Sequence, residues 1–428
     1  MRVDHRLLLP SLASASLLAA GCPESGGGNA TAADAETEGA TATTTGGSPL
    51  PDSDGTDGGS TGPAAPTGAL PPSQPVDLAW TVFDVGVGSK PEVAVSSDGT
   101  VHVASIYEEQ PGWIRWSAME SNATGPGAEV DVAVGYFYGP IALGTLSDGA
   151  PVIAYHDHDL EDQVLATGLG GDGFDLAPMA NPGHDGWYSS LHVTADDRVH
   201  TATFDPMQFG GMGVFYGTYD GSWTTALAVP GAFDYINGTS IAVGPDGTVY
   251  IATFSDAAGE PLLARIAVGG DWQVSTIEPR GSHLDVGFFP SLVIAPDGTL
   301  HLTYLVRDEP SSGQIRYARG GYDTLELFDA ADFNDVSINF EGARSVSTLA
   351  ILPDGRPVVA YQTTQTTNVL IIGDDEVLTN TVATTEGSTP FGQQTSIATG
   401  DDGQIHLVWW IHDGSVPGTV QYARATAP

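Results

Sequence analysis

An Asp-Gly pair that recurs at a near-constant interval constrains the fold of this chain more than any other feature. Each copy lies between two apolar stretches, and successive copies are separated by 50, 48, 50, 51, 57 and 48 residues when an Asp-Asp pair is counted as the third copy. Such a pair between apolar runs is a strong hairpin signal, because a type I′ turn needs positive φ at both central positions. The sequence therefore predicts seven hairpins. Their turns begin at Asp98, Asp148, Asp196, Asp246, Asp297, Asp354 and Asp402.

Two further strand-like runs follow each of the first six hairpins, and one follows the seventh. The third run ends in an aromatic or small residue, as in Ile114–Ser117 and Ile315–Ala318, and the fourth alternates polar and apolar residues, as in Trp223–Leu227. Four antiparallel strands in about 50 residues make one blade of a β-propeller. The second run of each unit is apolar or small on both faces, which is expected of a strand whose sheet is packed between two neighbouring sheets.

The first and last units indicate how the ring of blades closes. The seventh unit ends at Pro428 just after its third run, whereas Leu78–Phe83, before the first unit, has the pattern of a fourth strand. Pairing of the segment that begins at Leu78 with the stretch that ends at Arg424 would remove the free edge of the last blade. We therefore predict an all-β domain at 78–428, a seven-bladed β-propeller of four-stranded antiparallel blades closed by the N-terminal strand.

The repeats resemble those of secreted seven-bladed propellers in the sialidase-like and BNR-like repeat superfamily, and the resemblance covers the whole predicted propeller. It implies the fold, but the catalytic signatures of sialidases are missing. The Asp-box of that family, Ser-x-Asp-x-Gly-x-x-Trp, is expected between third and fourth strands, where this chain has Tyr219–Trp223 and Gly269–Trp272. The three inward arginines that clamp a carboxylate there have no matching set, since Arg344 is the only arginine beside an innermost strand.

Composition and charge narrow the function classes. The chain has 53 acidic and 13 basic residues and a net charge of −40, so its field repels phosphate backbones and no nucleic-acid partner is expected. It contains one cysteine and therefore cannot form an internal disulfide. No G-x-S-x-G, H-E-x-x-H or phosphate-loop motif occurs, so the common nucleophile, zinc and nucleotide signatures are absent from the sequence.

The N-terminus has the pattern of an export signal. Residues 1–21 carry two arginines and then an apolar run that is too short to span a bilayer. The end of this segment, Leu18–Cys22, resembles the lipobox of bacterial lipoproteins, which implies diacylglycerol transfer to the sulfur of Cys22 and cleavage just before it. The alternative is a chance cysteine beside an ordinary cleavage site.

The stretch between that cysteine and the propeller, 22–77, is rich in Gly, Ser, Thr, Ala and Pro and contains acidic residues but no Lys or Arg. Such a composition cannot bury a core, so we expect a disordered acidic linker with a reach of about 40 Å. Pro23, rather than aspartate, follows the cysteine, which under the enterobacterial sorting rule permits transfer to the outer membrane. We expect an exported protein that is anchored to the cell envelope, at the outer membrane, and contacts the membrane through its N-terminal lipid only.

An acidic loop is the best metal candidate. His156–Asp162, between the second and third strands of the second unit, places six ionisable side chains within seven residues. Carboxylates in a flexible loop suit calcium, and the two histidines would admit a transition metal instead. The alternative is a solvated acidic loop. The candidate calcium ligands are Asp157, Asp159, Glu161 and Asp162.

Four histidines recur at one position of the repeat, four residues after the turn aspartate. Equivalent positions stand around the ring, too far apart for their side chains to share one ion at about 2 Å. We interpret them as half-buried side chains whose nitrogens bond to backbone or turn-aspartate groups. They are His102, His200, His301 and His406.

Aromatic residues gather just before the innermost strands, near one mouth of the central channel. Acidic residues of the second-to-third loops, such as Asp205 and Asp308, are expected at the same mouth. This combination suits a sugar, whose C–H face stacks on a ring while carboxylates bond its hydroxyls; the alternative is packing between blades. The candidate ligand-binding residues are Tyr138, Trp187, Tyr188, Tyr235, Phe289, Phe340 and Phe391.

These features favour a surface-tethered, non-enzymatic propeller that binds a glycan, a polymer or a partner protein, such as a protein of the envelope. The first alternative is an exported polysaccharide hydrolase or lyase that uses acidic residues at the channel mouth. A hydrolase would need two carboxylates at a glycosidase separation. The second alternative is a scaffold subunit of an envelope assembly, because propellers serve enzymes, lectins and scaffolds alike.

Overall fold

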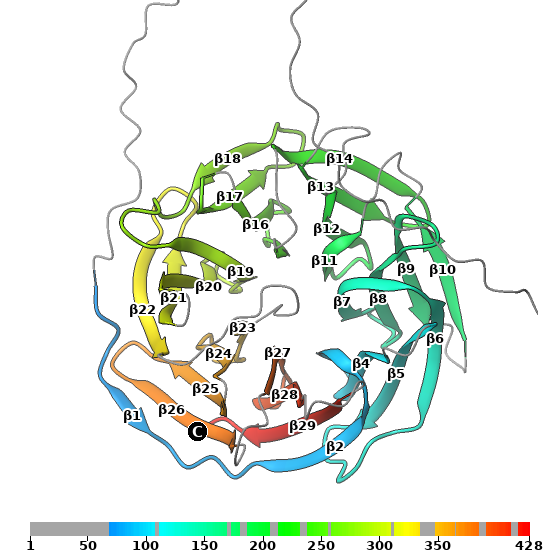
Figure 1. Ribbon diagram of the computed structural model, residues 1–428, viewed down its shortest axis with the longest axis horizontal. Coiled ribbons are helices and arrows are strands. Elements are labelled where there is room, and N and C mark those ends of the chain that lie inside the picture. The colour runs from blue at the N-terminus through cyan, green and yellow to red at the C-terminus, as the bar shows by residue number, and fades with distance from the viewer. Residues whose placement is uncertain are drawn as a thin grey trace, which may run out of the picture. The chain divides into compact units, whose positions relative to one another are not determined.

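The structure of the protein is a computed structural model that describes residues 68–107, 111–168, 173–179, 186–205, 213–231, 238–255, 258–309, 312–333, 347–363, 365–384, 391–411 and 418–428. These residues form strands β1 to β29 and no helix. The strands make seven sheets, and Figure 1 shows them arranged as blades around a ring. The prediction of an all-β, seven-bladed propeller is confirmed. In this part of the chain, no helix has the length and apolar character needed to cross a membrane.

Each of the first five blades consists of four consecutive strands, with the first strand innermost. Blade 1 contains β3 (Ser89–Val95), β4 (Thr100–Tyr107), β5 (Gly112–Glu120) and β6 (Glu129–Gly135). Blade 2 contains β7 (Phe137–Thr145), β8 (Pro151–Asp157), β9 (Asp162–Gly168) and β10 (Phe174–Pro178). Blade 3 contains β11 (Trp187–Val193), β12 (Val199–Asp205), β13 (Gly213–Tyr219) and β14 (Trp223–Pro230).

Blades 4 to 6 follow the same plan, whereas blade 7 has only three consecutive strands. Blade 4 contains β15 (Thr239–Val243), β16 (Val249–Ser255), β17 (Glu260–Ile266) and β18 (Gln273–Thr276). Blade 5 contains β19 (Asp285–Ile294), β20 (Leu300–Glu309), β21 (Ser312–Gly320) and β22 (Glu326–Phe333). Blade 6 contains β23 (Ser347–Ile351), β24 (Pro357–Gln362), β25 (Thr366–Ile372) and β26 (Val377–Thr384). Blade 7 contains β27 (Phe391–Thr399), β28 (Gln404–Ile411) and β29 (Thr419–Thr426).

The N-terminal strand completes blade 7, as the sequence predicts. Strand β2 (Thr81–Val87) pairs antiparallel with β29, with Thr81 opposite Arg424 and Val87 opposite Thr419. The three C-terminal strands therefore gain their fourth strand from the other end of the described chain, and the edge of β29 is covered. This pairing closes the ring in Figure 1.

A short strand precedes β2 and joins blade 6. Strand β1 (Ser73–Pro75) pairs parallel with the outer strand β26, and the side chain of Asn380 donates to the carbonyl of Val76. The indole Nε1 of Trp80 donates to Asn380 Oδ1 at 2.6 Å, and Leu78, 7% exposed, packs into the core shared by blades 6 and 7. Strand β1 lies within the stretch that composition assigns to the linker. We call 73–87 the N-terminal strap.

The seven hairpin turns share one geometry, and it differs from the expected type I′ turn. Only the second residue of each pair has positive φ, between 62° and 90°, and its N–H donates to the carbonyl three residues earlier at 2.8 to 3.0 Å. This is a type I turn followed by a left-handed residue, the three-residue hairpin loop. In the six Asp-Gly turns the aspartate Oδ1 accepts the N–H two residues later at 2.9 to 3.0 Å, which explains why aspartate precedes the glycine.

The core lies between the blades. Every residue of β12 is buried, and the second strands of the other blades are mostly buried along their length. One core cluster combines Ile106 and Ile114 of blade 1 with Ile153 and Tyr155 of blade 2. This packing explains why the second strands are apolar on both faces, and it leaves the innermost strands to line the axis of the ring.

Candidate functional site

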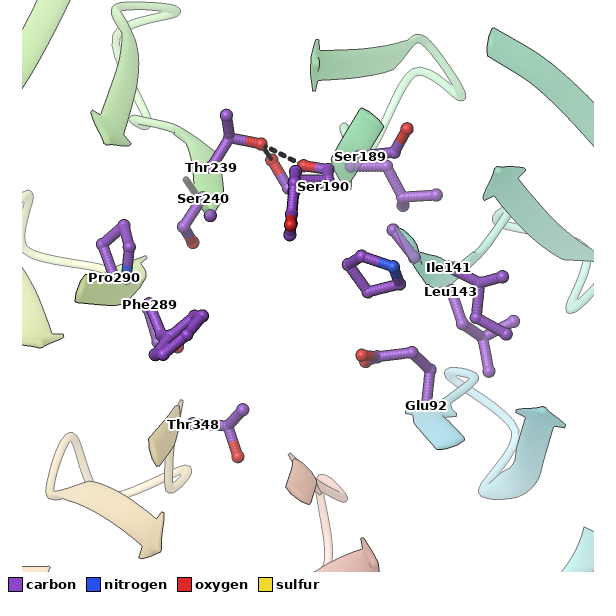
Figure 2. A pocket seen from close by; sticks show the side chains of 16 residues that line it. Glu92, Ile141, Leu143, Ser189, Ser190, Thr239, Ser240, Phe289, Pro290 and Thr348 are labelled. Carbon is purple, nitrogen blue, oxygen red and sulfur yellow. Dashed lines mark hydrogen bonds between the residues drawn. The ribbon is translucent and has the colours of Figure 1, made fainter. Parts of the chain in front are cut away.

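The axis of the ring holds a cavity of about 160 Å³. Residues of the innermost strands and of the segments just before them line it, and Figure 2 shows their side chains arranged around it. The described lining residues are mostly hydroxyl-bearing or apolar, and one of them, Glu92, has a carboxyl group. We call this space the axial cavity.

One position of the repeat brings an equivalent residue from every blade to the axis. It lies six residues before the turn aspartate, and on the second strand it faces alanine in five blades. Five blades have serine or threonine there, blade 2 has alanine, and blade 1 has glutamate. The seven axial residues are Glu92, Ala142, Ser190, Ser240, Ser291, Thr348 and Ser396.

The hydroxyl groups at this position link neighbouring blades. Ser240 Oγ accepts the backbone N–H of Leu292 at 2.9 Å, and Ser291 Oγ accepts that of Leu349 at 3.1 Å. Ser396 Oγ accepts the N–H of Val93 at 3.2 Å in the same way. Because adjacent innermost strands do not pair with each other, these bonds satisfy N–H groups that would otherwise lack a partner. A serine or threonine at this position is therefore explained by the fold.

Glu92 breaks this pattern and is held firmly in place. Ser396 accepts an N–H from blade 1 and donates its own hydroxyl hydrogen to Glu92 Oε2 at 2.7 Å. Glu92 keeps some exposed surface, but that surface faces the axial cavity, deep in the ring. Burial raises the pKa of Glu92 to about 8, although the hydrogen bond from Ser396 and the side chain of Gln394 beside it oppose that shift. At neutral pH the carboxyl group is therefore mostly protonated and can both donate and accept.

Bulges interrupt the innermost strands just before the axial position, and in two blades they bring an aromatic side chain to the cavity. The pairing of the innermost strand is interrupted there in five blades. The residue two positions before the axial one has positive φ in Lys90, Tyr188 and Phe289, at 51°, 55° and 51°. Bulky residues rarely adopt this conformation, and such strain tends to be retained at functional sites. Tyr188 and Phe289 both line the axial cavity.

The predicted aromatic residues are only partly brought together. Tyr188 and Phe289 reach the axial cavity, but each is only 4% exposed, so they form part of its wall and no open stacking platform. Trp187 packs in the core instead, with its ring 5.3 Å from that of His156. The backbones of Tyr138 and Phe391 lie in β7 and β27, while their side chains, and the whole of Tyr235 and Phe340, lie outside the described residues.

The acidic loop of blade 2 does not gather its carboxylates. It forms a tight connection between Asp157, the last residue of β8, and Asp162, the first of β9. Asp157 Oδ1 accepts the N–H groups of Asp159 and Leu160 at 2.9 and 3.3 Å, so this carboxylate serves the turn itself. Among the described residues, which include all four candidate ligands, no group of three or more acidic, histidine or cysteine side chains is placed to hold a metal ion.

The four recurring histidines pair with aromatic residues in their own blades. His200, His301 and His406 each lie within 2.6 to 2.7 Å of a tyrosine hydroxyl on the third strand, and the indole of Trp116 donates to His102 at 3.2 Å. Burial lowers the pKa of each of these histidines to about 4. The imidazoles are thus neutral structural groups of blades 1, 3, 5 and 7.

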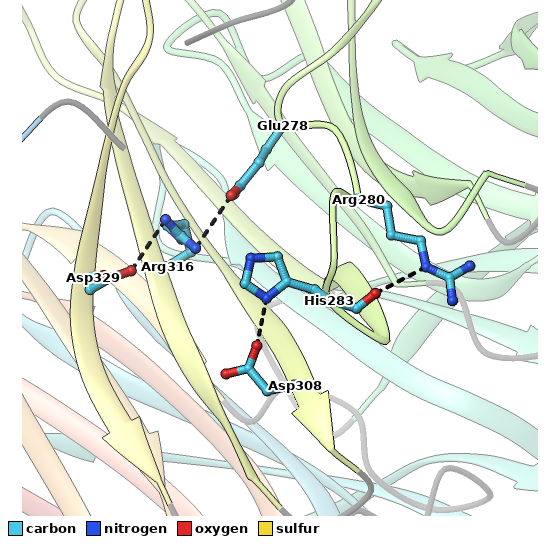
Figure 3. Close-up of polar contacts among 6 residues, drawn as sticks. All are labelled: Glu278, Arg280, His283, Asp308, Arg316 and Asp329. Carbon is cyan, nitrogen blue, oxygen red and sulfur yellow. Dashed lines mark hydrogen bonds and ion pairs between the residues drawn. The ribbon is translucent and has the colours of Figure 1, made fainter. Parts of the chain in front are cut away.

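A second buried polar group lies away from the axis, between blades 4 and 5 (Figure 3). Arg316, 2% exposed, pairs with the buried Glu278 at 3.3 Å and with Asp329 at 3.2 Å. Tyr304 donates to Glu278 at 2.7 Å, and burial raises the pKa of its hydroxyl well above 10. This cluster fastens the connection between β18 and β19 to blade 5, and we regard it as structural.

Sequence reasoning missed Glu92. The signal was present, because alignment of the seven repeats on their turn aspartates places one glutamate in a column of serine, threonine and alanine. What the alignment alone does not show is that this column faces the axis, since side chains of a strand alternate between its two faces.

Comparisons with known proteins support the fold alone. No protein family model matches the chain, and no curated protein matches it. Among solved structures, the BP39L lectin from Burkholderia pseudomallei is 12% identical, with a TM-score of 0.57 over 80% of this chain and 97% of the lectin. The polysaccharide lyase Uly1 is 12% identical, with a TM-score of 0.51 over 79% of this chain and 90% of the lyase. The NanB sialidase from Streptococcus pneumoniae is 12% identical, with a TM-score of 0.42 over 83% of this chain and 70% of the sialidase.

Proposed function

We propose that this protein is a carbohydrate-binding propeller that takes a sugar ring into its axial cavity. One observation carries the proposal: among seven equivalent positions at the axis, a single blade replaces the small residue with a carboxyl group, Glu92, and it points into the cavity (Figure 2). The fold does not require this replacement, because serine or threonine suffices in five other blades. A buried polar group without a structural need is a candidate for ligand recognition.

The size of the axial cavity agrees with a single six-membered ring. An engineered apolar cavity of about 150 Å³ holds one benzene molecule, and this cavity measures about 160 Å³. It would therefore admit one sugar ring, with the rest of a chain outside. Tyr188 and Phe289 supply apolar wall, while axial hydroxyls supply polar contacts.

The hydrogen-bonding capacity of the lining also suits a polyhydroxylated ring. Ser240 and Ser291 each accept a backbone N–H, and a hydroxyl group retains one donor hydrogen after doing so. The protonated carboxyl group of Glu92 can donate to one sugar oxygen and accept from another hydroxyl. The lectin named above has this fold, which makes sugar binding compatible with the scaffold and adds nothing about residues.

A polysaccharide hydrolase or lyase is less well supported. A hydrolase of the usual kind needs two carboxyl groups on either side of the bond that it cleaves. Of the described residues that line the axial cavity, only Glu92 carries one. The mouth residue Asp308 lies 2.5 Å from His283 and does not line the cavity. We therefore favour binding without catalysis.

Filling the axial cavity tests the proposal. Ala142 occupies the axial position of blade 2, so Ala142→Leu adds bulk to the cavity without removing a polar group. Binding of the full-length protein to a panel of mono- and oligosaccharides, measured by calorimetry, should weaken at least tenfold in this variant. Ala226→Leu, the same substitution at an exposed position of β14, is the matched control. Sugar binding that Ala142→Leu leaves unchanged would place the site elsewhere.

We also propose that the protein is exported and anchored to the cell envelope, at the outer membrane, through a lipid on Cys22. This residue and residues 1–67 as a whole lie outside the described residues, and the support is the sequence pattern. Replacement Cys22→Ser should abolish incorporation of radiolabelled palmitate and release the protein from the membrane fraction. Unchanged labelling would contradict the anchor.

A further inference from the structure

We infer that the axial cavity selects an amino sugar, a sugar ring that carries a protonated amine, with Glu92 as the counter-ion of that amine. The inference rests on the proposed sugar binding and names the substrate class. Its observation is one carboxyl group held in a fixed position, alone in a cavity whose other described lining residues carry no charge.

Within the described part of the chain, Glu92 is a carboxyl group with uncharged neighbours. No arginine or lysine of the described residues forms an ion pair with it, and its contacts are the neutral side chains of Ser396 and Gln394. By contrast, the carboxylate of Glu278, which is 4% exposed, pairs with Arg316. A carboxyl group that is buried without a counter-ion is costly to ionise. A ligand that brings an ammonium group lowers this cost, so Glu92 releases its proton to the solvent on binding and forms an ion pair that a neutral ligand cannot form.

The position of Glu92 is suited to receive such a ligand. Ser396, in blade 7, donates a hydrogen bond to Glu92 Oε2. In Figure 2 the carboxyl group of Glu92 points into the cavity, and the ring of Phe289 lies on the opposite side. The donor hydrogens of Ser240 and Ser291 come from blades 4 and 5. A ring with its ammonium group at Glu92 would thus present hydroxyl oxygens to these serines.

The charge of the whole protein acts in the same direction. A net charge of −40 concentrates cations near the surface and repels anions. A sugar with a carboxylate, such as a uronic acid, would be repelled by this field and would meet a carboxyl group in the cavity. A sugar with an amine would be favoured by both. Salt weakens the long-range part of the attraction, whereas contact with Glu92 inside the cavity is less affected.

Matched sugars and matched variants test the inference. D-glucosamine and D-glucose differ by an amine in place of one hydroxyl, and D-galactosamine and D-galactose form a second such pair. We would measure dissociation constants by calorimetry on the full-length protein in 0.15 M salt. We expect at least one amino sugar to bind about 10- to 100-fold more tightly than its neutral counterpart, the range for hydrogen bonds to a charged group.

The variant Glu92→Gln should remove this preference while keeping the shape of the side chain. Glu120→Gln, at an exposed end of β5, removes the same charge elsewhere and should keep the preference. Should Glu92→Gln fail to fold, Glu92→Asp withdraws the carboxyl group by one methylene and should reduce the preference. An unchanged preference in the folded Glu92 variant would overturn the role of this residue.

The remaining outcomes separate the two proposals. Equal affinities for the amino sugars and their neutral counterparts would overturn the inference and leave the proposed sugar binding intact. No binding of any sugar, neutral or amino, would overturn both. Cyclohexylammonium is the control for the amine alone: if it binds as tightly as the preferred amino sugar, the cavity recognises an amine on any six-membered ring, and the assignment to sugars fails.

Discussion

Glu92 differs from the residues at the same position of the other six repeats. Its six counterparts are small, and the hydroxyl groups among them connect adjacent blades at 2.9 to 3.2 Å. Glu92 reaches further into the axial cavity and depends on Ser396 of the last blade for its position. Its environment therefore exists only when the ring is closed, and this leads to a test of stability as well as of binding.

We expect Glu92 to lower the stability of the propeller as pH rises. Its pKa is raised to about 8 in the folded protein but is ordinary in the unfolded chain. Between pH 4.5 and 8 the folded state therefore keeps a proton that the unfolded state loses, so unfolding becomes easier with increasing pH. Glu92→Gln should remove this contribution, a gain on the order of 1 kcal/mol per pH unit in that window.

Denaturant unfolding of both proteins at pH 5 and pH 8 provides the measurement. The variant should gain stability relative to the wild type at pH 8 and much less at pH 5. A difference that is the same at both pH values would show that the carboxyl group titrates normally.

The four paired histidines should have the opposite pH dependence. Burial lowers the pKa of His406 to about 4, whereas the unfolded chain titrates near 6.5. Their contribution to stability is complete above pH 6.5 and is lost as pH falls towards 4, because protonation favours the unfolded state. Each should cost on the order of 1 kcal/mol between pH 6.5 and 5.

His406→Gln should make the acid-side loss of stability shallower, since glutamine does not titrate. The thermal midpoint measured at several pH values from 7 to 4.5 gives that slope. The comparison of slopes is independent of the stability that the variant loses at pH 7 when the contact with Tyr422 Oη, 2.7 Å long, is changed. A slope equal to that of the wild type would contradict the assignment.

At the scale of the element, the repeated hairpin turn combines a left-handed residue with an aspartate carboxylate. Blade 3 departs from the rule, because Asp197 stands where the other blades have glycine, at φ 62°. Aspartate tolerates this region better than most residues. Its carboxylate accepts the N–H and the Oγ–H of Ser147, in the turn of blade 2, at 2.6 Å each. The aspartate that replaces glycine in blade 3 thus links the hairpin turns of blades 2 and 3.

Substitution of Asp197 separates these two effects. Asp197→Gly removes the link to Ser147 and relieves the backbone, whereas Asp197→Ala removes the link and keeps an unfavourable φ. We expect thermal midpoints in the order wild type, glycine variant, alanine variant. An alanine variant that equals the glycine variant would show that the backbone conformation at this position is not constrained.

The strands were predictable because the signal for them is local and repeated. Apolar runs on both sides of a turn define β4 and β12 from their own residues, and seven copies make the blade number evident. The exact turn geometry was not predictable, since an Asp-Gly pair fits both a type I′ turn and the type I turn with a left-handed residue that occurs here. The bulges before the axial positions, which aim Tyr188 and Phe289 at the cavity, leave no clear mark in the sequence.

The candidate site was less predictable because it depends on contacts between blades. Seven aromatic residues near strand starts suggested a stacking surface, yet Trp187 packs into the core and Phe289 is almost fully buried. The metal prediction for the acidic loop that begins at His156 likewise depended on how many ionisable residues lie close together in the sequence. Its described side chains form no group of three that could hold a metal ion. Conversely, Glu92 and Ser396 are 304 residues apart and become partners only through ring closure.

At the scale of the whole molecule, stability depends on strand β2, which comes early in the described chain and pairs with the last strand, β29. Strand β2 covers the edge of β29, and Leu78 fills the space between blades 6 and 7. The remaining three strands of blade 7 would otherwise present an unpaired edge, which is a template for association with another chain.

Truncation tests this dependence. A chain that begins at Gly88 lacks the whole N-terminal strap, and we expect it to melt at lower temperature and to form dimers or larger species through the edge of β29. A chain that begins at Val76 loses only β1 and should stay monomeric if the parent chain is. Light scattering with size-exclusion chromatography measures the mass, and a monomeric Gly88 chain of unchanged melting temperature would show that closure by β2 is dispensable.

The order of attachment along the strap has a mechanical consequence. A pulling force applied to the N-terminal segment acts first on β1. There, three residues pair with β26, the outer strand of blade 6, and the Trp80 side chain bonds to Asn380 of that strand. The force reaches strand β2 only after these contacts of β1 and Trp80 have broken. Because β1 is short and exposed, it can detach from β26 under tension and pair again when the force falls. The pairing of β2 with β29, which closes the ring, is kept meanwhile.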